Sequence, residues 1–349
     1  MPVLRVVLLA VAFVLGLLLT LPALVLISPF LLVAWLTRAL SELGSRERDS
    51  VAWQDLIEFE PVIGWRPKPG LDVFGRADDL FHLVTGPDGW RGSTRLEDAD
   101  IVAFGDSFAF GHGSDDDQMF SSLPDDVCVK PIGCDGYDMV QTLLWMERLA
   151  PHLHGKLVVW LPFYGNDLWD NLHPAMTHYR KPFLRQMDST GDWEVVTDHV
   201  TPEPWPFPSR KDHQTALAEI CHAGSATQRR AAGACEYLVE RASAACADAG
   251  AELVVIGIPE RIQLTERGRR RLRSLAAMSE GFDAMLPDRM VEQACDSAGV
   301  RFVPLSRHLS ASDYLVQDAH WRPSGHRKLG GLLSELAGER SAVGASRTH

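Results

Sequence analysis

Short apolar runs alternate with longer helix-forming stretches over residues 99–335 of this 349-residue chain. A strand, a covering helix and a second strand make a right-handed crossover, so the alternation predicts an α/β fold with a mostly parallel sheet. Strands are expected at Ile101–Phe104, Val127–Val129, Leu157–Phe163, Leu253–Ile258 and Val300–Pro304. Helices are expected near Met139–Leu149, Ala232–Ala249 and Asp283–Ala298.

The N-terminus carries a long uncharged segment. No charged residue occurs from Val6 to Thr37, and about 20 apolar residues are enough to cross a bilayer core of about 30 Å. The segment exceeds the apolar core of a signal peptide, and no Ala-x-Ala site closes it before Arg38. We therefore expect residues 6–37 to be an uncleaved, single-pass anchor in the lipid bilayer, kinked at Pro22 or Pro29.

Other composition shifts divide the rest of the chain. Turn-rich pieces flank alternating residues around Leu80–Val84, which predicts a small β extension. A stretch rich in Trp, Pro and His departs from the strand-helix alternation and is expected to cover a substrate. The predicted parts are an anchor at 1–40, a connector and β extension at 41–98, an α/β domain at 99–335 with an insertion at about 168–230, and a flexible tail at 336–349.

Charge and cysteine content narrow the function classes. A formal net charge of -12 argues against a nucleic-acid partner, because phosphate binding needs clustered Lys and Arg. Five arginines lie between Arg267 and Arg273, and a solvated helix face is favoured over an anionic contact. The six cysteines are read as mostly buried thiols, with a Cys221–Cys235 disulfide as the alternative in an exported domain.

Three separated motifs carry residue types that ester cleavage needs. They are Gly105-Asp106-Ser107-Phe108, Gly165-Asn166-Asp167 and Asp318-Ala319-His320. A serine hydroxyl needs a base, and that base needs an orienting partner, so Ser107, His320 and Asp318 are the predicted catalytic residues. The Asn166 amide and the backbone N–H groups of Ser107 and Gly136 are predicted to hold the oxyanion.

Other polar residues are read as structural. His112, beside glycines, is expected on the surface, and Asp115–Asp117 in a solvated loop. His152 and His154 lack further ligands at metal-binding spacing. His326 is expected to cap or pack the terminal helix. No metal or cofactor is implied.

The motifs, taken together and in this order, resemble the SGNH hydrolase superfamily, or GDSL-type esterases. Ser107 matches the first block, Gly133-Cys134-Asp135-Gly136-Tyr137 the second, Gly165-Asn166-Asp167 the third and Asp318-Ala319-His320 the last. The resemblance covers roughly residues 60–333. It implies a three-layer, flavodoxin-like α/β/α sandwich with a five-stranded parallel sheet, and chemistry on ester-linked acyl groups. Lys130-Pro131-Ile132 departs from the family pattern, in which an Asn often precedes the glycine of the second block.

The sequence therefore predicts a membrane-anchored serine esterase acting on acyl esters, with an O-acetylated glycan as one candidate substrate. An O-acyltransferase acting on cell-envelope glycans shares the acyl-enzyme and is the close alternative. A non-catalytic glycan-binding protein with the same fold is a further alternative. Arginines 38, 46 and 48 favour a cytoplasmic domain, whereas envelope-glycan relatives favour the exported side, which is the side we predict.

Overall fold

The computed structural model describes residues 50–176, 179–188, 191–203, 209–276 and 280–347. The predicted membrane segment, residues 6–37, lies outside these ranges. Among the helices of the described ranges, none has the length and apolar character needed to cross a bilayer. The bilayer contact and the side of the membrane therefore stay predictions. From Ser50 onward the chain forms one compact unit.

A five-stranded parallel sheet lies at the centre of this unit, as the sequence predicts. Its strand order is β13-β12-β7-β5-β6, so β5, which comes first in the chain among these five strands, has neighbours on both sides. β5, β6 and β7 are buried along their whole lengths, which explains the continuous apolar runs of β5 and β7. The strands are β5 (Ile101–Gly105), β6 (Val129–Gly133), β7 (Leu157–Leu161), β12 (Glu252–Gly257) and β13 (Arg301–Pro304).

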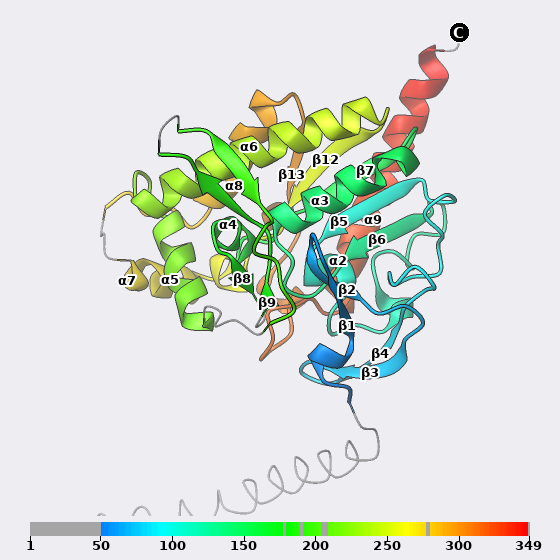
Figure 1. Ribbon diagram of the computed structural model, residues 1–349, viewed down its shortest axis with the longest axis horizontal. Helices are drawn as coiled ribbons and strands as arrows, with labels where there is room; N and C mark the ends of the chain where they lie inside the picture. Colours follow the sequence, from blue (N-terminus) through cyan, green and yellow to red (C-terminus); the bar gives the residue numbers. More distant parts are fainter. Residues whose placement is uncertain (1–49, 177–178, 189–190, 204–208, 277–279, 348–349) are drawn as a thin grey trace, which may run out of the picture. The chain divides into compact units, whose positions relative to one another are not determined.

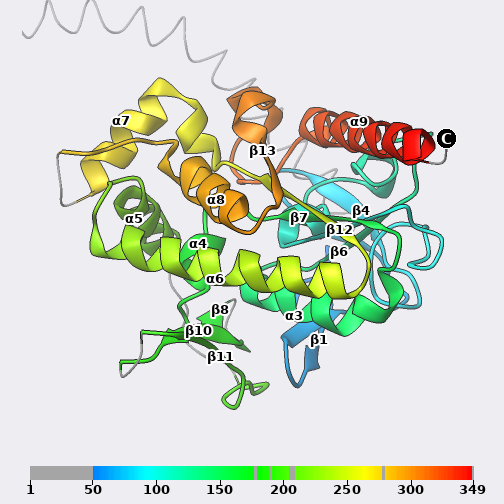
Figure 2. The ribbon, with the colours of Figure 1, turned by 90° about the horizontal axis from the view of Figure 1, so that it is seen from above.

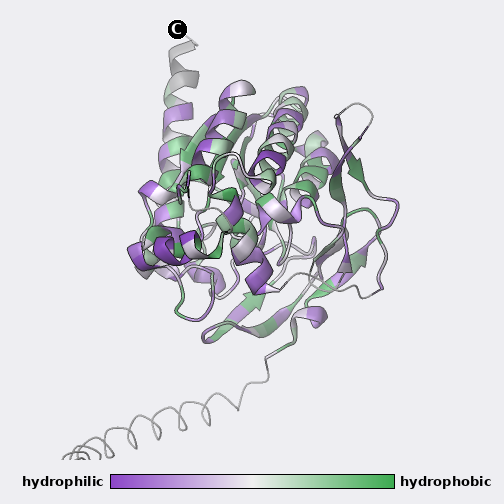
Figure 3. Ribbon diagram, turned by 90° about the vertical axis from the view of Figure 1, so that its left-hand side faces the viewer, coloured by the Kyte–Doolittle hydropathy of each residue, from purple (hydrophilic) through white to green (hydrophobic). Residues whose placement is uncertain are grey.

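Helices cover both faces of the sheet and complete three layers (Figures 1 and 2). Alternate side chains of β5 enter separate cores: Val102 and Phe104 pack with α3, α6 and α8, and Ile101 and Ala103 with α2 and α9. Figure 3 colours the same ribbon by hydropathy, and both hydrophobic and hydrophilic segments occur along its helices. The helices are α2 (Ser107–Phe110), α3 (Met139–Leu149), α4 (Asp167–Asp170), α5 (Arg210–Ile220), α6 (Ala226–Asp248), α7 (Glu266–Leu275), α8 (Leu286–Ser297) and α9 (Pro323–Arg347).

The terminal helix α9 continues where the sequence predicts a flexible tail. It runs to Arg347, because Leu336 is buried against the sheet and Arg340 forms an ion pair with Glu252. His326 lies in this helix and packs between Phe120 and Trp321. Burial lowers the pKa of His326 to about 3, so its imidazole is neutral.

The predicted β extension consists of two antiparallel hairpins. β1 (Ile57–Glu60) pairs with β2 (Gly64–Pro67), and β3 (Asp72–Arg76) pairs with β4 (Leu80–Val84). The buried Arg91 guanidinium fixes the adjoining loop by donating to Asp116 and to the Gly111 carbonyl. The prediction of a solvated loop at Asp115–Asp117 is therefore wrong for Asp116, and also for Asp115, which accepts from the His82 N–H. The buried cation needs a carboxylate partner.

The insertion folds into short hairpins followed by α5. Its strands are β8 (Ala175–Met176), β9 (Tyr179–Arg180), β10 (Phe183–Gln186) and β11 (Trp193–Val196). Lys181, fully buried, forms an ion pair with the fully buried Asp138 at the N-cap of α3. Its ammonium also donates to the Asp170 carbonyl at 2.7 Å. This ion pair joins the insertion to the α/β domain.

Replacing Lys181 with Met is expected to lower the free energy of unfolding by about 3 kcal/mol, because the buried Asp138 would lose its countercharge. Urea unfolding followed by tryptophan fluorescence measures the change. Arg185→Met is the matched control: its ion pair with Glu194 is 58% exposed on the arginine side and is worth less than about 1 kcal/mol. Equal losses in both variants would contradict the importance of the buried pair.

All six cysteines are free thiols in the structure, and five of them are buried. This agrees with the sequence prediction of mostly buried thiols. The thiols of Cys221 and Cys235 are not joined. Burial raises the pKa of Cys221 to about 12, so it stays a neutral thiol. Short 3-10 turns complete the described elements, at Trp53–Asp55, Asp116–Gln118, Ala150–His152, Arg261–Leu264, Leu305–Arg307 and Ala311–Asp313.

Candidate active site

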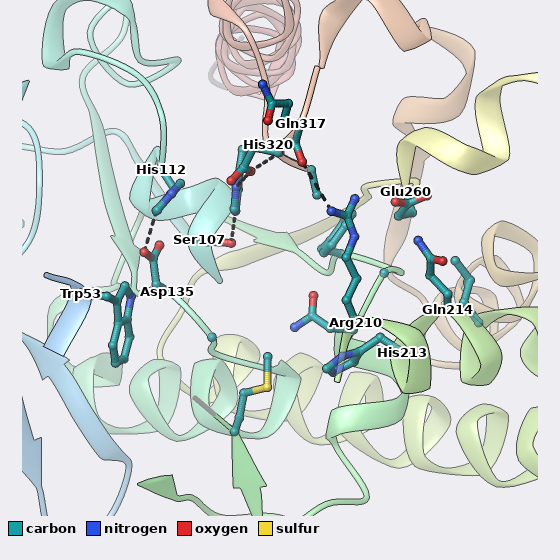
Figure 4. Close-up of a pocket in the computed structure, with 18 residues that line it drawn as sticks. Trp53, Ser107, His112, Asp135, Arg210, His213, Gln214, Glu260, Gln317 and His320 are labelled. Carbon is teal, nitrogen blue, oxygen red and sulfur yellow. Dashed lines mark hydrogen bonds and ion pairs between the residues drawn. The ribbon is translucent and has the colours of Figure 1, made fainter. Parts of the chain in front are cut away.

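A cavity of about 450 Å³ lies beyond the carboxyl ends of β5 and β7 (Figure 4). The chain passes from β5 to β6 on one side and then to β7 on the other, so the strand order reverses here. Such a switch point is where open α/β sheets bind ligands. All five predicted site residues, Ser107, Gly136, Asn166, Asp318 and His320, line this cavity.

Ser107 is placed by a tight turn between β5 and α2. Asp106 caps the helix by accepting the Phe108 N–H at 2.9 Å, and Ser107 is its first residue. A Cβ on Gly133 of the neighbouring strand would lie 2.7 Å from the Ala109 Cβ and from the Asp106 carbonyl oxygen. Glycine there lets the turn lie against β6. Burial raises the pKa of Asp106 to about 7.

Ser107, His320 and Asp318 form one hydrogen-bonded chain. The Ser107 Oγ lies 2.6 Å from the His320 Nε2, and the His320 Nδ1 bonds to the Asp318 carboxylate. Burial opposes ionisation of Asp318, but the His320 hydrogen bond outweighs it and holds the pKa of the carboxyl well below its usual value. An ionised Asp318 accepts from Nδ1–H, which leaves Nε2 free to accept the serine proton.

The loop that carries this histidine is held by Asp78, a residue that the sequence reasoning missed. Its carboxylate accepts the backbone N–H groups of Val316, Gln317 and Asp318 at 2.5, 3.0 and 2.9 Å. Asp78 lies in the turn between β3 and β4. The β extension thus fixes the position of the histidine loop. An Asp in a hairpin turn gives no sequence signal for such a role.

His112 is not the surface residue that the sequence suggests. Its ring lies 4.5 Å from the His320 ring, centroid to centroid, and its Nδ1 lies 2.7 Å from an Asp135 carboxylate oxygen. Burial alone would lower the pKa of His112, but the Asp135 carboxylate reverses the effect and raises it. The site therefore contains a second imidazole-carboxylate pair, one residue before Gly136.

Candidate oxyanion donors lie along the same cavity. Gly136 has φ +77°, a left-handed conformation that glycine adopts without strain. Asn166 is the N-cap of α4, but its side chain does not cap the helix, and it lines the cavity. A Cβ on the preceding Gly165 would lie 2.4 Å from the Phe163 ring, so this turn also needs glycine. These features leave the Asn166 amide available as a donor.

The insertion, which the sequence predicts to cover a substrate, supplies part of the cavity wall. Met176 of β8 and Leu217 of α5 give apolar surface together with Trp53 and Phe163. His213 of α5 donates toward the buried Asp170 at 3.0 Å, which fixes α5 beside α4. The cavity therefore combines a polar end near Ser107 with an apolar wall.

One group of ligand-type atoms in the described residues is compact enough for a metal ion. The atoms of His112, Asp318 and His320 lie within 4.8 Å of one another. The His320 Nδ1 is already hydrogen-bonded to the Asp318 carboxylate, and the His320 Nε2 is hydrogen-bonded to the Ser107 Oγ. A metal bound there would compete with the serine-histidine hydrogen bond.

Comparison with known proteins gives distant similarities. No protein-family model matches the sequence, and no curated protein matches it. Among solved structures the chain is similar to Est24, a carbohydrate acetylesterase from Sinorhizobium meliloti. The two sequences are 13% identical, the match covers 70% of this chain and 98% of that chain, and the TM-score is 0.37. A carbohydrate acetylesterase family member from the same organism gives 12% identity, 68% and 95% coverage, and a TM-score of 0.37. Similarity at this level does not establish an activity for this chain.

Proposed function

We propose that this protein is a serine esterase that cleaves acyl esters. The observation that carries the proposal is the hydrogen-bonded chain from Ser107 through His320 to Asp318, which lines a cavity at the sheet's switch point. A nucleophile, a base and an orienting carboxylate in this order are the parts that acyl transfer requires. The four motif blocks that resemble SGNH hydrolases support the same conclusion.

The proposed reaction begins when the Ser107 Oγ attacks the ester carbonyl carbon and its proton moves to the His320 Nε2. Negative charge gathers on the carbonyl oxygen, where the Asn166 amide and the N–H groups of Ser107 and Gly136 donate. Collapse breaks the bond to the alcohol oxygen, which takes the proton from His320. Water then attacks the acyl-enzyme with His320 again as the base, and releases the acid and the free serine.

An ester panel tests this function. Acetyl and longer acyl esters of 4-nitrophenol report turnover directly, and the apolar wall formed by Trp53, Met176 and Leu217 predicts that chains longer than acetyl are accepted. Absence of turnover on every ester would contradict the esterase. The O-acyltransferase and the glycan-binding protein stay alternative predictions. The first would pass the acyl group from the same serine to a glycan hydroxyl, and the second would bind acetylated glycan without turnover.

Asn166→Ala is expected to lower kcat by about 10² to 10³ with little change in KM, because its donor acts on charge that develops in the transition state. Steady-state kinetics on the best ester of the panel measure both constants. Gln317→Ala is the matched control, since this amide also lines the cavity but has no proposed contact with the oxyanion. A rise in KM at constant kcat would show that Asn166 serves ground-state binding instead.

A further inference from the structure

A second cavity, of about 480 Å³, adjoins the candidate active site. The two cavities share several lining residues, so they lie side by side along the histidine loop. The shared residues are Arg210, Gln214, Glu260, Asp318 and Ala319. Figure 4 shows Arg210, Gln214 and Glu260 on the side of the first cavity that lies away from His112 and Trp53. We call this second cavity the arginine recess.

Helix α7 presents two of its arginines to the recess. Arg267 and Arg271 are four residues apart, which places them on the same face of the helix. The other arginines of this run have different partners: Arg269 donates to the Gln263 carbonyl, Arg270 pairs with Glu266, and Arg273 lies over the Phe282 ring. All five arginines of the run are exposed, as the predicted solvated face requires, and two of them also line the recess.

The facing wall of the recess comes from α5 and the segment after β12. Arg271 donates to the Gln214 Oε1 at 2.9 Å, which joins α7 to α5. Arg261 is committed elsewhere, because it donates to the Leu315 and Val316 carbonyls of the histidine loop. In the described part of the chain, Arg267 has neither an ion pair nor a hydrogen bond to a side chain that would neutralise it.

The acidic residues of the recess do not balance its arginines. Asp318 is already bonded to His320. Glu260 is buried and its carboxylate accepts the Ile262 N–H, and burial raises its pKa. Arg210, Arg261, Arg267 and Arg271 thus line the recess with two carboxylates, and an excess of positive charge remains in a recess that adjoins the cavity lined by Ser107.

We propose that the arginine recess binds an anionic group, a carboxylate or a phosphate, on the alcohol portion of the ester. Guanidinium groups bind both anions through paired N–H donors, with strength and direction that a solvated lysine lacks. An anion held by Arg267 and Arg271 would anchor the alcohol portion beside the histidine loop, with the ester carbonyl at Ser107. This inference names the substrate class of the proposed esterase and rests on it.

Matched substrates test the recess. Acetate esters of straight-chain ω-hydroxy acids of increasing length are compared with the corresponding primary amides, which have the same shape without the charge. The wild-type chain is expected to prefer the acid over the amide by about tenfold in kcat/KM at the length that reaches the recess. Esters with a terminal phosphate in place of the carboxylate show which anion fits better. The preference should decrease with added salt, since these arginines are solvent-exposed.

Two double variants of α7 distinguish the arginines that line the recess from those that lie elsewhere on the helix. The double variant Arg267→Gln, Arg271→Gln should raise KM for the acid and so remove the preference for it, while turnover of the amide stays unchanged. Arg270→Gln with Arg273→Gln removes the same charge from the same helix outside the recess, and should keep the preference. An equal kcat/KM for acid and amide in the wild-type chain at every length would overturn the proposed anion site. An equal loss of the acid preference in both double variants would overturn it as well.

The recess can also be tested without turnover. If no ester is cleaved, the proposed esterase fails, and calorimetric binding of the unacetylated ω-hydroxy acids still reports on the recess. Binding that is lost in Arg267→Gln with Arg271→Gln but kept in the control variant would support an anion site in a protein that is not an esterase. Equal binding to all three proteins, or binding to none, would overturn the recess itself.

Discussion

Ser107→Ala is expected to lower kcat for ester hydrolysis by a factor on the order of 10⁴ or more, because no acyl-enzyme can form without the hydroxyl. Folding should be unaffected, since the change removes one oxygen from a residue that is 8% exposed and whose backbone is held by the Asp106 cap. Initial rates on the best ester, with thermal unfolding measured alongside, give both quantities.

Ser114→Ala is the matched control for this loss. Ser114 is also a buried serine, and its Oγ has no hydrogen-bond partner among the described residues. Its replacement should leave kcat within about a factor of two, because it removes no interaction. A Ser107→Ala protein that keeps wild-type turnover would show that another residue is the nucleophile. An equal loss in both variants would indicate that the site tolerates no change in side-chain volume.

His320→Gln is expected to cost a similarly large factor in kcat, since the base and the later acid are the same imidazole. Asp318→Asn should cost about 10³ to 10⁴, because the only hydrogen bond from Nδ1 to a described residue goes to Asp318, and an amide can reverse the tautomer. Steady-state kinetics on the same ester measure both variants. The double variant His320→Gln, Asp318→Asn should be no worse than His320→Gln alone, since the two residues act as a unit.

His112→Gln is the comparison for this pair of variants. His112 also pairs with a carboxylate and lies against His320, but the side-chain hydrogen bond to the Ser107 Oγ comes from His320. Its loss should reduce kcat much less than the loss of His320. Additive effects of His320→Gln and Asp318→Asn would contradict the hydrogen-bonded unit, and a larger effect of His112→Gln would exchange the roles of the two histidines.

The central sheet could be predicted from the sequence because β5, β7 and β12 are buried on both faces and form continuous apolar runs. The boundaries were less accurate where local chemistry is ambiguous. The sequence pattern predicts the second strand of the sheet at Val127–Val129, whereas β6 runs from Val129 to Gly133. Lys130 and Pro131 do not suggest a strand. The Lys130 ammonium is paired with Asp88, and β6 is an edge strand, where a proline is tolerated.

In the candidate site, too, the residues in local sequence motifs could be predicted, whereas those brought together only by the fold could not. Ser107 and Asn166 follow apolar strands, and Asp318 and His320 are two residues apart, so local pattern was enough to select them. Asp78 contacts Val316 across 238 positions, and His112 is brought to His320 by the fold. Neither contact has a local sequence pattern. The arginine recess likewise depends on how α5 and α7 pack, which composition alone does not determine.

Labelling of the wild-type chain with a fluorophosphonate, followed by mass spectrometry of its peptides, tests the central claim most directly. The reagent forms a covalent bond only with a serine that a neighbouring base activates. We predict one adduct, on Ser107, that is absent from Ser107→Ala and strongly reduced in His320→Gln. An unlabelled wild-type protein, or an adduct on another residue that persists in Ser107→Ala, would contradict the assignment of Ser107 as the nucleophile.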